Sequence, residues 1–173
     1  DTCRRQRQMC IRDSARRGNK LEGLKEKDLI GIPWLLAFAL RADGWYLRQD
    51  IIWNKPNPMP ESVRDRCTKS HEYIFLLSKS QNYYFDVDAI KEPTRRKRSV
   101  WDITKKPYKD AHFAVFPPDL IEPCIKAGSE RGDIILDPFM GSGTTAMVSK
   151  QLGRDYIAVS YTHLTLPTTG IVW

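Results

Sequence analysis

The sequence predicts an α/β fold in which helices flank a parallel sheet. The first observation is that helical and strand patterns alternate along most of the chain. The second is the order in its last third, where a helix, a strand, a glycine-rich turn, a helix and a strand follow one another. That order is typical of a βαβ unit. With 173 residues, of which 41% are hydrophobic, the chain is long enough for one domain with one core.

The first predicted elements are a helix over residues 32–42 and a strand over residues 45–53. Pro33 suits the first turn of this helix, and Gly44 suits the position just after its end. The strand segment is rich in aromatic and β-branched side chains, which favour extended structure.

A long loop and two further strands are predicted next. Residues 54–70 contain three prolines, so we expect no regular structure there. Residues 71–79 predict a second strand, and the nearly continuous apolar run at 73–77 predicts that it is buried on both faces. Residues 83–85 predict a short third strand.

The second half of the chain begins with its least regular stretch, residues 91–110, which contains four consecutive basic residues. After this stretch the patterns become regular again. They predict a helix at 119–126 ending near Gly128, a strand at 133–136, a helix at 144–152 and a strand at 155–159.

Composition limits the classes of protein to consider. No apolar run reaches about 18 residues, so no membrane-spanning segment is expected. The four cysteines form neither a CxxC pair nor a zinc-binding spacing, which predicts free thiols, no metal site and a cytoplasmic protein. The net charge of +7 suits a polyanionic partner. Many basic proteins bind no nucleic acid, however, so charge alone does not decide the partner.

Both ends of the chain look foreign to the rest. Residues 9–14 and residues 158–163 can be encoded by opposite strands of one DNA segment, which resembles a transposase end used in sequencing-library adapters. We therefore expect residues 1–14 and 159–173 to be translated adapter and residues 15–158 to be native. Continuous coding sequence through both junctions at the source locus would contradict this expectation.

The most informative segment is the glycine-rich turn after the strand that ends at Asp137. Gly141 and Gly143 let the backbone approach a ligand closely, and a helix begins immediately after them. The start of a helix offers free N–H groups and a positive dipole end to a carboxylate or phosphate. The segment therefore predicts a binding site at the carboxyl end of the strand.

Three interpretations of this turn are open from the residues alone. A triphosphate-binding loop is nearly excluded, because no lysine follows the second glycine. Residues 141–146 fit the loose GxGxxA pattern of a nicotinamide dinucleotide site. The third interpretation is a turn that serves only packing.

The surrounding residues favour one family. The string Asp-Pro-Phe-x-Gly-Ser-Gly-Thr-Thr at 137–145 resembles the S-adenosylmethionine loop of amino-group DNA methyltransferases. Four further segments resemble successive blocks of the same family, in the circularly permuted (β-type) order in which the base-side half precedes the cofactor-side half. They are residues 27–34, 50–56, 68–75 and 112–117.

This resemblance implies a partial Rossmann-like S-adenosylmethionine-dependent methyltransferase sheet in circularly permuted order. Residues 27–90 would form the base-side half, 91–111 a variable basic segment and 112–158 the cofactor-side half. The implied activity is methyl transfer from S-adenosylmethionine to the amino group of cytosine (N4) or adenine (N6) in DNA. Residues 55–62 resemble the cytosine-N4 enzymes slightly more. The alternatives are a nicotinamide-dependent oxidoreductase and a non-catalytic nucleic-acid-binding fragment.

The resemblance also implies which residues bind the cofactor, with Phe113 and Phe116 equally suited to core packing. The family's catalytic Asp/Asn/Ser-Pro-Pro-aromatic tetrapeptide and the acid that would bind the ribose are absent from the sequence. We therefore assign no catalytic residue and expect the isolated chain to be inactive. The cofactor-binding residues implied by the family are Phe113, Asp137, Pro138, Phe139, Gly141, Ser142, Gly143 and Thr144.

The expected partner is double-stranded DNA, with a cognate restriction endonuclease as a further expected partner and a bacterial, archaeal or phage gene as the source. His71 and Glu72 lie where the family borders its base pocket. Two basic segments are candidates for phosphate or recognition contacts, against the alternative of ordinary solvated loops. Their residues are Lys55, Arg64, Arg66 and Lys69, and Arg95, Arg96, Lys97 and Arg98.

Overall fold

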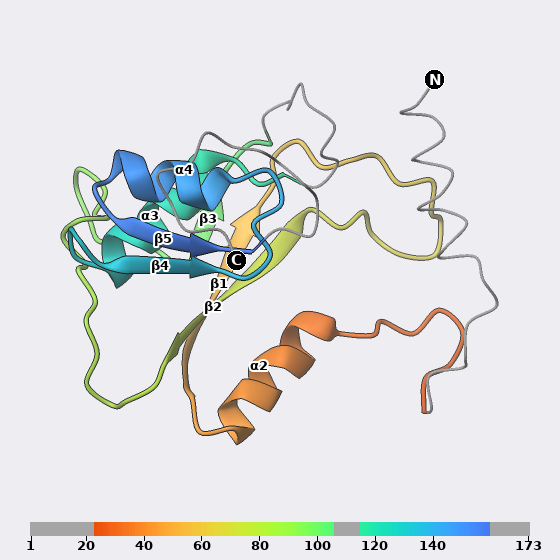
Figure 1. Ribbon diagram of the computed structural model, residues 1–173. Helices are drawn as coiled ribbons and strands as arrows, with labels where there is room; N and C mark the ends of the chain where they lie inside the picture. Colours follow the sequence, from red (N-terminus) through yellow and green to blue (C-terminus); the bar gives the residue numbers. More distant parts are fainter. Residues whose placement is uncertain (1–22, 106–114, 160–173) are drawn as a thin grey trace. The chain divides into compact units, whose positions relative to one another are not determined.

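The structure is a computed structural model that describes residues 23–105 and 115–159 (Figure 1). Helices and strands alternate along the described part of the chain, as the sequence predicts. In chain order the elements are α2 (Ile32–Ala42), β1 (Tyr46–Asn54), β2 (His71–Ser78), β3 (Val100–Asp102), α3 (Pro118–Gly128), β4 (Ile134–Asp137), α4 (Thr144–Gln151) and β5 (Asp155–Ala158).

The chain divides into two compact units within α2, residues 1–36 and residues 37–173. The predicted bounds of α2 are confirmed. Gly44 follows the helix with φ of +98°, a left-handed conformation that glycine adopts without strain. None of the helices in the described ranges is long and apolar enough to cross a membrane.

The larger unit contains a three-stranded sheet in the order β2-β1-β3. β1 and β2 are antiparallel, with Trp53 opposite Glu72 and Asn54 opposite His71. β3 is parallel to β1 and pairs with its last three residues. The connection between β1 and β2 has no helix or strand, as its prolines predict.

Two expectations about this sheet are wrong. β2 is not buried on both faces, because it lies at the edge of the sheet, where most of its side chains are half-buried and Glu72 is exposed. Residues 83–85 form no strand. The third strand is instead Val100–Asp102, within the segment expected to be variable, where the side chain of Trp101 is buried in the core.

The second half of the unit is the predicted βαβ arrangement. β4 and β5 are parallel and pair from Ile134–Asp155 to Asp137–Ala158, and α4 packs on this pair of strands (Figure 1). The guanidinium of Arg154 donates to the Ser129 carbonyl (Nη2–O 2.7 Å), so the start of β5 is joined to the end of α3. The strand–turn–helix–strand prediction is therefore confirmed.

The largest cluster of buried side chains lies between the three-stranded sheet and α3. Ile51, Trp53 and Trp101 from the sheet contact Leu120 from α3, with Phe116 and Cys124 packed against them. α3 also contacts α4. Because it touches both halves of the unit, α3 supplies a wall to each of them.

Candidate functional site

The turn after β4 is shaped by its own backbone and by Asp137. The Oδ1 atom of Asp137 accepts the N–H of Phe139 at 3.0 Å, and the buried Met140 donates its N–H to the Val159 carbonyl at 3.0 Å. Pro138 and Phe139 are left exposed, with 77% of Phe139 accessible. The carboxylate therefore orders the turn with one oxygen and keeps the other available for a ligand.

The two glycines of the turn are both left-handed, with φ of +55° at Gly141 and +82° at Gly143. A side chain would be strained at either position. Gly143 is the N-cap of α4 and provides no side-chain cap, while the Ser142 and Thr144 hydroxyls bond to each other at 3.1 Å. The first turn of α4 thus begins without a capping side chain, as an anion-binding helix start does.

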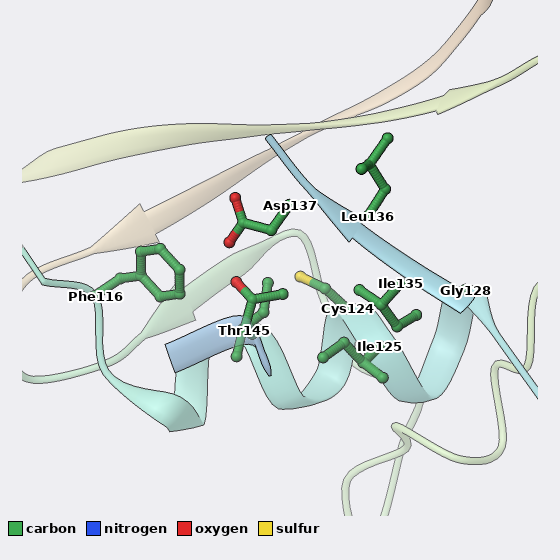
Figure 2. Close-up of a pocket in the computed structure, with 9 residues that line it drawn as sticks. Phe116, Cys124, Ile125, Gly128, Ile135, Leu136, Asp137 and Thr145 are labelled. Carbon is green, nitrogen blue, oxygen red and sulfur yellow. The ribbon is translucent and has the colours of Figure 1, made fainter. Parts of the chain in front are cut away.

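A cavity of about 390 Å³ adjoins this turn. Its polar end is formed by the Asp137 carboxylate and the Thr145 hydroxyl, which Figure 2 shows close to the ring of Phe116. The volume is within the range of small-molecule sites. The remaining wall is mostly apolar and comes from α3 and β4: Ile121, Cys124, Ile125, Gly128, Ile135 and Leu136.

Cys124 on this wall is a neutral thiol at ordinary pH. Burial raises its pKa to about 11, although the charge of Lys97 opposes the shift. Its Sγ lies 3.5 Å from the Leu120 carbonyl. Because the thiolate is the reactive form of cysteine, Cys124 acts here as an apolar wall residue.

Of the cofactor-binding residues implied by the sequence, Asp137 alone lines the cavity among those described, and Phe113 lies outside the described residues. Residues 138–144 form the turn and the helix start that follow Asp137, and none of them lines the cavity, so their role in cofactor binding stays a prediction. Phe116 packs in the core, as one of its two interpretations predicts, and it also lines the cavity; its contact with a cofactor stays a prediction.

The residues that the sequence implied for cofactor binding include none from α3, and they omit Thr145 although the motif contains it. Thr145 is the last residue of the recognised motif and is 4% exposed, yet it lines the cavity. Cys124 and Ile125 belong to the inward face of a helix whose apolar periodicity predicted only burial. The signal for Thr145 was therefore present in the motif, whereas the α3 wall depends on tertiary packing.

The basic candidates divide into two groups. In the first group the charge is already engaged. Lys55 is 7% exposed, ion-pairs with Glu72 and lies over the Trp53 ring at 4.5 Å. The other three are Arg66, paired with Glu61 at 2.6 Å, Arg95, paired with Glu92 at 2.5 Å, and Lys97, 4.9 Å from the Trp101 ring centroid. The hydrogen bond from Arg95 is the main cause that lowers the pKa of Glu92.

The second group is exposed and available. The side chains of Arg64, Lys69, Arg96 and Arg98 make no hydrogen bond or ion pair within residues 23–105 and 115–159. In the basic run at 95–98, engaged and available side chains therefore alternate along the chain. The part of the chain that the structure describes contains no cluster of three or more potential metal ligands.

Comparison with known proteins gives a consistent result. A family model described as DNA methylase matches residues 6–163, so the match extends into both terminal segments predicted to be foreign. The chain is 57% identical to the type II methyltransferase M.Cfr9I of Citrobacter freundii over 143 residues. That alignment covers 80% of this chain and 48% of M.Cfr9I.

A second relative and a solved structure are also similar to this chain. The chain is 58% identical to the type II methyltransferase M.SmaI of Serratia marcescens, with 80% of this chain and 50% of that protein covered. It thus spans about half the length of both relatives. The M1.HpyAVI–SAM complex superimposes with a TM-score of 0.63 and 29% identity over 78% of this chain and 66% of that one.

Proposed function

Because the chain belongs to the DNA methylase family, we propose that the whole protein transfers a methyl group from S-adenosylmethionine to an amino group of a DNA base. The single observation that carries this proposal is the Asp137 carboxylate beside an uncapped, two-glycine helix start at the polar end of the cavity. The names of its relatives and the cofactor in the M1.HpyAVI complex support it. The nicotinamide alternative has no such support.

The residues of the cavity fit the chemical groups of this cofactor. The oxygen of Asp137 that the turn does not use suits the ammonium of the methionine part. The first-turn N–H groups of α4 suit its carboxylate. Phe116 and the apolar wall of α3 suit its less polar parts. The fit thus uses charge at one end of the cavity and apolar contact along the rest.

In this proposal the chain contributes binding and orientation. When bound, S-adenosylmethionine supplies an electrophilic methyl group on a sulfonium. Asp137 and the helix start fix the position of the donor, and the apolar wall excludes water from it. No residue of this chain is assigned to the target amine, because the family's tetrapeptide is absent from the sequence. We expect little or no methyl transfer from this chain alone.

The proposed acceptor is cytosine N4 or adenine N6 in double-stranded DNA, with cytosine favoured by the resemblance of residues 55–62. The four available cations, Arg64, Lys69, Arg96 and Arg98, are the proposed phosphate contacts. Lys55 is instead a support of the β1–β2 pair through Glu72. The type II names of the relatives support a cognate restriction endonuclease as a further partner.

Cofactor binding to the chain tests the central claim. Asp137→Asn keeps an acceptor for the Phe139 N–H but removes the charge, so we expect S-adenosylmethionine to bind about tenfold more weakly or worse. Asp155→Ala is the matched control, because this exposed acid begins the neighbouring strand at the opposite end. Equal affinities of wild type and Asp137→Asn, or no binding by wild type, would overturn the assignment of this cavity.

A further inference from the structure

One edge of β4 faces away from β5, and we call it the open edge. It pairs with no strand in residues 23–105 and 115–159, because β4 and β5 form a sheet of two strands. The carbonyls of Asp133 and Asp137 both point towards β5, where they accept the N–H groups of Asp155 (2.9 Å) and Val159 (3.0 Å). The odd-numbered residues of β4 are therefore the ones whose backbones bond to β5.

The two residues between them, Ile134 and Leu136, point the other way. Since backbone direction alternates along a strand, their N–H and carbonyl groups face the open edge. Their side chains are exposed too, as is that of Ile157 beside them on β5. Parallel sheets are normally covered on both faces, and two strands alone are seldom stable. β4 thus has the apolar composition of an interior strand but lies at an edge.

The cavity runs along this open edge. Three consecutive residues of β4, 135–137, line it. Successive side chains of a strand lie on opposite faces, as Figure 2 shows for Ile135 and Leu136 on the two sides of the β4 ribbon. A cavity that touches all three residues therefore follows an edge, and β5 occupies the other one. The apolar side chains of α3 form the opposite wall, so the open edge borders an apolar slot.

We propose that the open edge is the docking site of an extended, apolar segment from the part of the whole protein outside these 173 residues, which adds to β4 as a parallel strand. The chain spans 48% of M.Cfr9I and 50% of M.SmaI, so each relative contains about as much sequence again. Addition of a strand uses backbone hydrogen bonds for affinity and side-chain pockets for selection. The backbone of Leu136 and the α3 wall offer both.

A parallel strand in this place would end beside Asp137, since the carboxyl ends of parallel strands lie at one side of a sheet. In α/β sheets, ligands bind just beyond these ends. The segment would therefore fill the apolar part of the cavity and bring its last residues to the polar end, next to Asp137 and Thr145. This inference depends on the geometry of β4 and would hold whichever donor the cavity binds.

The first test is hydrogen exchange along β4. The full chain is co-expressed with the portion of M.SmaI that lies outside its alignment with this chain, and the complex is compared with the chain alone. The Leu136 amide, which faces the open edge, should exchange at least about tenfold more slowly in the complex. The Ile135 amide faces β5 and should be protected in both samples, so it is an internal control from the same strand.

The second test uses two proline variants. Leu136→Pro removes an N–H that faces the open edge and leaves the bonds to β5 in place, so copurification with the M.SmaI portion should fall at least about tenfold. Val100→Pro is the matched control. The Ser99 carbonyl and the Ile103 N–H bond to β1, so the N–H of Val100 faces the outer edge of β3. It should associate like wild type. Protection of the Ile135 amide checks that β4 stays folded.

Four results would overturn the inference. They are no complex between wild type and the M.SmaI portion, a complex in which the Leu136 amide stays unprotected, equal association of Leu136→Pro and wild type, and a dimer of the chain alone in which that amide is protected. The last result would assign the open edge to a second copy. Binding of S-adenosylmethionine to the chain is measured separately, so none of these results decides the proposed function.

Discussion

The two halves of the larger unit are held together by different kinds of contact. In the three-stranded sheet, Trp53 is 4% exposed, and its Nε1 donates to the carbonyl of Ile103, fifty positions further along the chain. In the β4–α4–β5 half, the turn is ordered by contacts within residues 137–159, such as Asp137 with Phe139. One outward face of this half is apolar and open, with Ile134 63% and Leu136 64% exposed.

This difference explains which features a sequence reveals. A turn ordered by near neighbours carries its signature in consecutive residues, so the glycine motif can be recognised directly. A surface ordered by distant partners has no local signature. The Lys55–Glu72 pair and the Asn57–Lys105 contact become visible only when the strands are paired.

The largest expected effect tests the contrast in burial directly. Trp53→Ala should lower the free energy of unfolding by about 3–5 kcal/mol, because it empties a buried aromatic site and leaves the Ile103 carbonyl without its donor. Ile134→Ala, on the open face of β4, should cost less than about 0.5 kcal/mol. Denaturant unfolding of both variants measures the difference. Similar losses of unfolding free energy in the two variants would contradict the difference in burial between Trp53 and Ile134.

A pH effect tests the wall that the two halves share. The pKa of Cys124 is raised by burial to about 11, so the folded state holds the neutral thiol while the unfolded chain ionises near pH 9. The folded state should therefore lose up to about 2–3 kcal/mol of stability as the pH rises from 9 to 11. Cys124→Ala should remove this dependence, and Cys67→Ala, at an exposed thiol, should retain it. An unchanged pH profile in Cys124→Ala would contradict the account.

Substitutions of Gly143 and Gly153 have a smaller expected effect on stability, and they separate backbone strain from a role in cofactor binding. Gly143 and Gly153 both have positive φ, of +82° and +73°, and they flank the same helix. Alanine at either position should cost about 1–2 kcal/mol of stability. Only Gly143→Ala should also weaken S-adenosylmethionine binding, as titration calorimetry would measure. Equal cofactor affinities in the two variants would place the ligand away from the turn.

The smallest expected effect concerns the alternating basic run. Arg96→Ala should reduce the slope of log affinity against log salt for a duplex by about 0.9, because one phosphate contact is lost. Arg95→Ala should leave the slope unchanged, because Arg95 is paired with Glu92. Salt titrations of the two variants under identical conditions make the comparison. A larger loss of slope in Arg95→Ala than in Arg96→Ala would show that the Arg95–Glu92 ion pair breaks when DNA binds.

Much of the fold could be predicted from the sequence because helix ends and turns have local causes. Pro33, Gly44 and the glycine motif mark their elements by backbone geometry alone, and the structure agrees at each. β3 was missed because three residues carry too little pattern, and its position depends on the burial of Trp101 against distant side chains. Residues 83–85 show the opposite error. Their aromatic side chains favour a strand, but the segment pairs with no strand in the described part of the chain.

The candidate site shows the same division. At its polar end Asp137 was among the predicted residues and Thr145 lies in the motif, whereas the apolar wall was not predicted, because the burial of α3 gives no sign of which neighbour it faces. The alternation of engaged and available basic side chains at 95–98 could also not be predicted from the sequence. A run of four basic residues looks uniform until Glu92 and Trp101 are placed beside it.

The double role of α3 restricts how the donor preference of such a protein could be redesigned. Phe116 and Cys124 face the cavity and also pack on the tryptophan core, so shortening either one would loosen the sheet that carries the basic segments. Ile135 of β4 lines the cavity without joining that core. Room for an alkyl group bulkier than methyl should therefore be made from the β4 side, where a gain in volume leaves the aromatic packing intact.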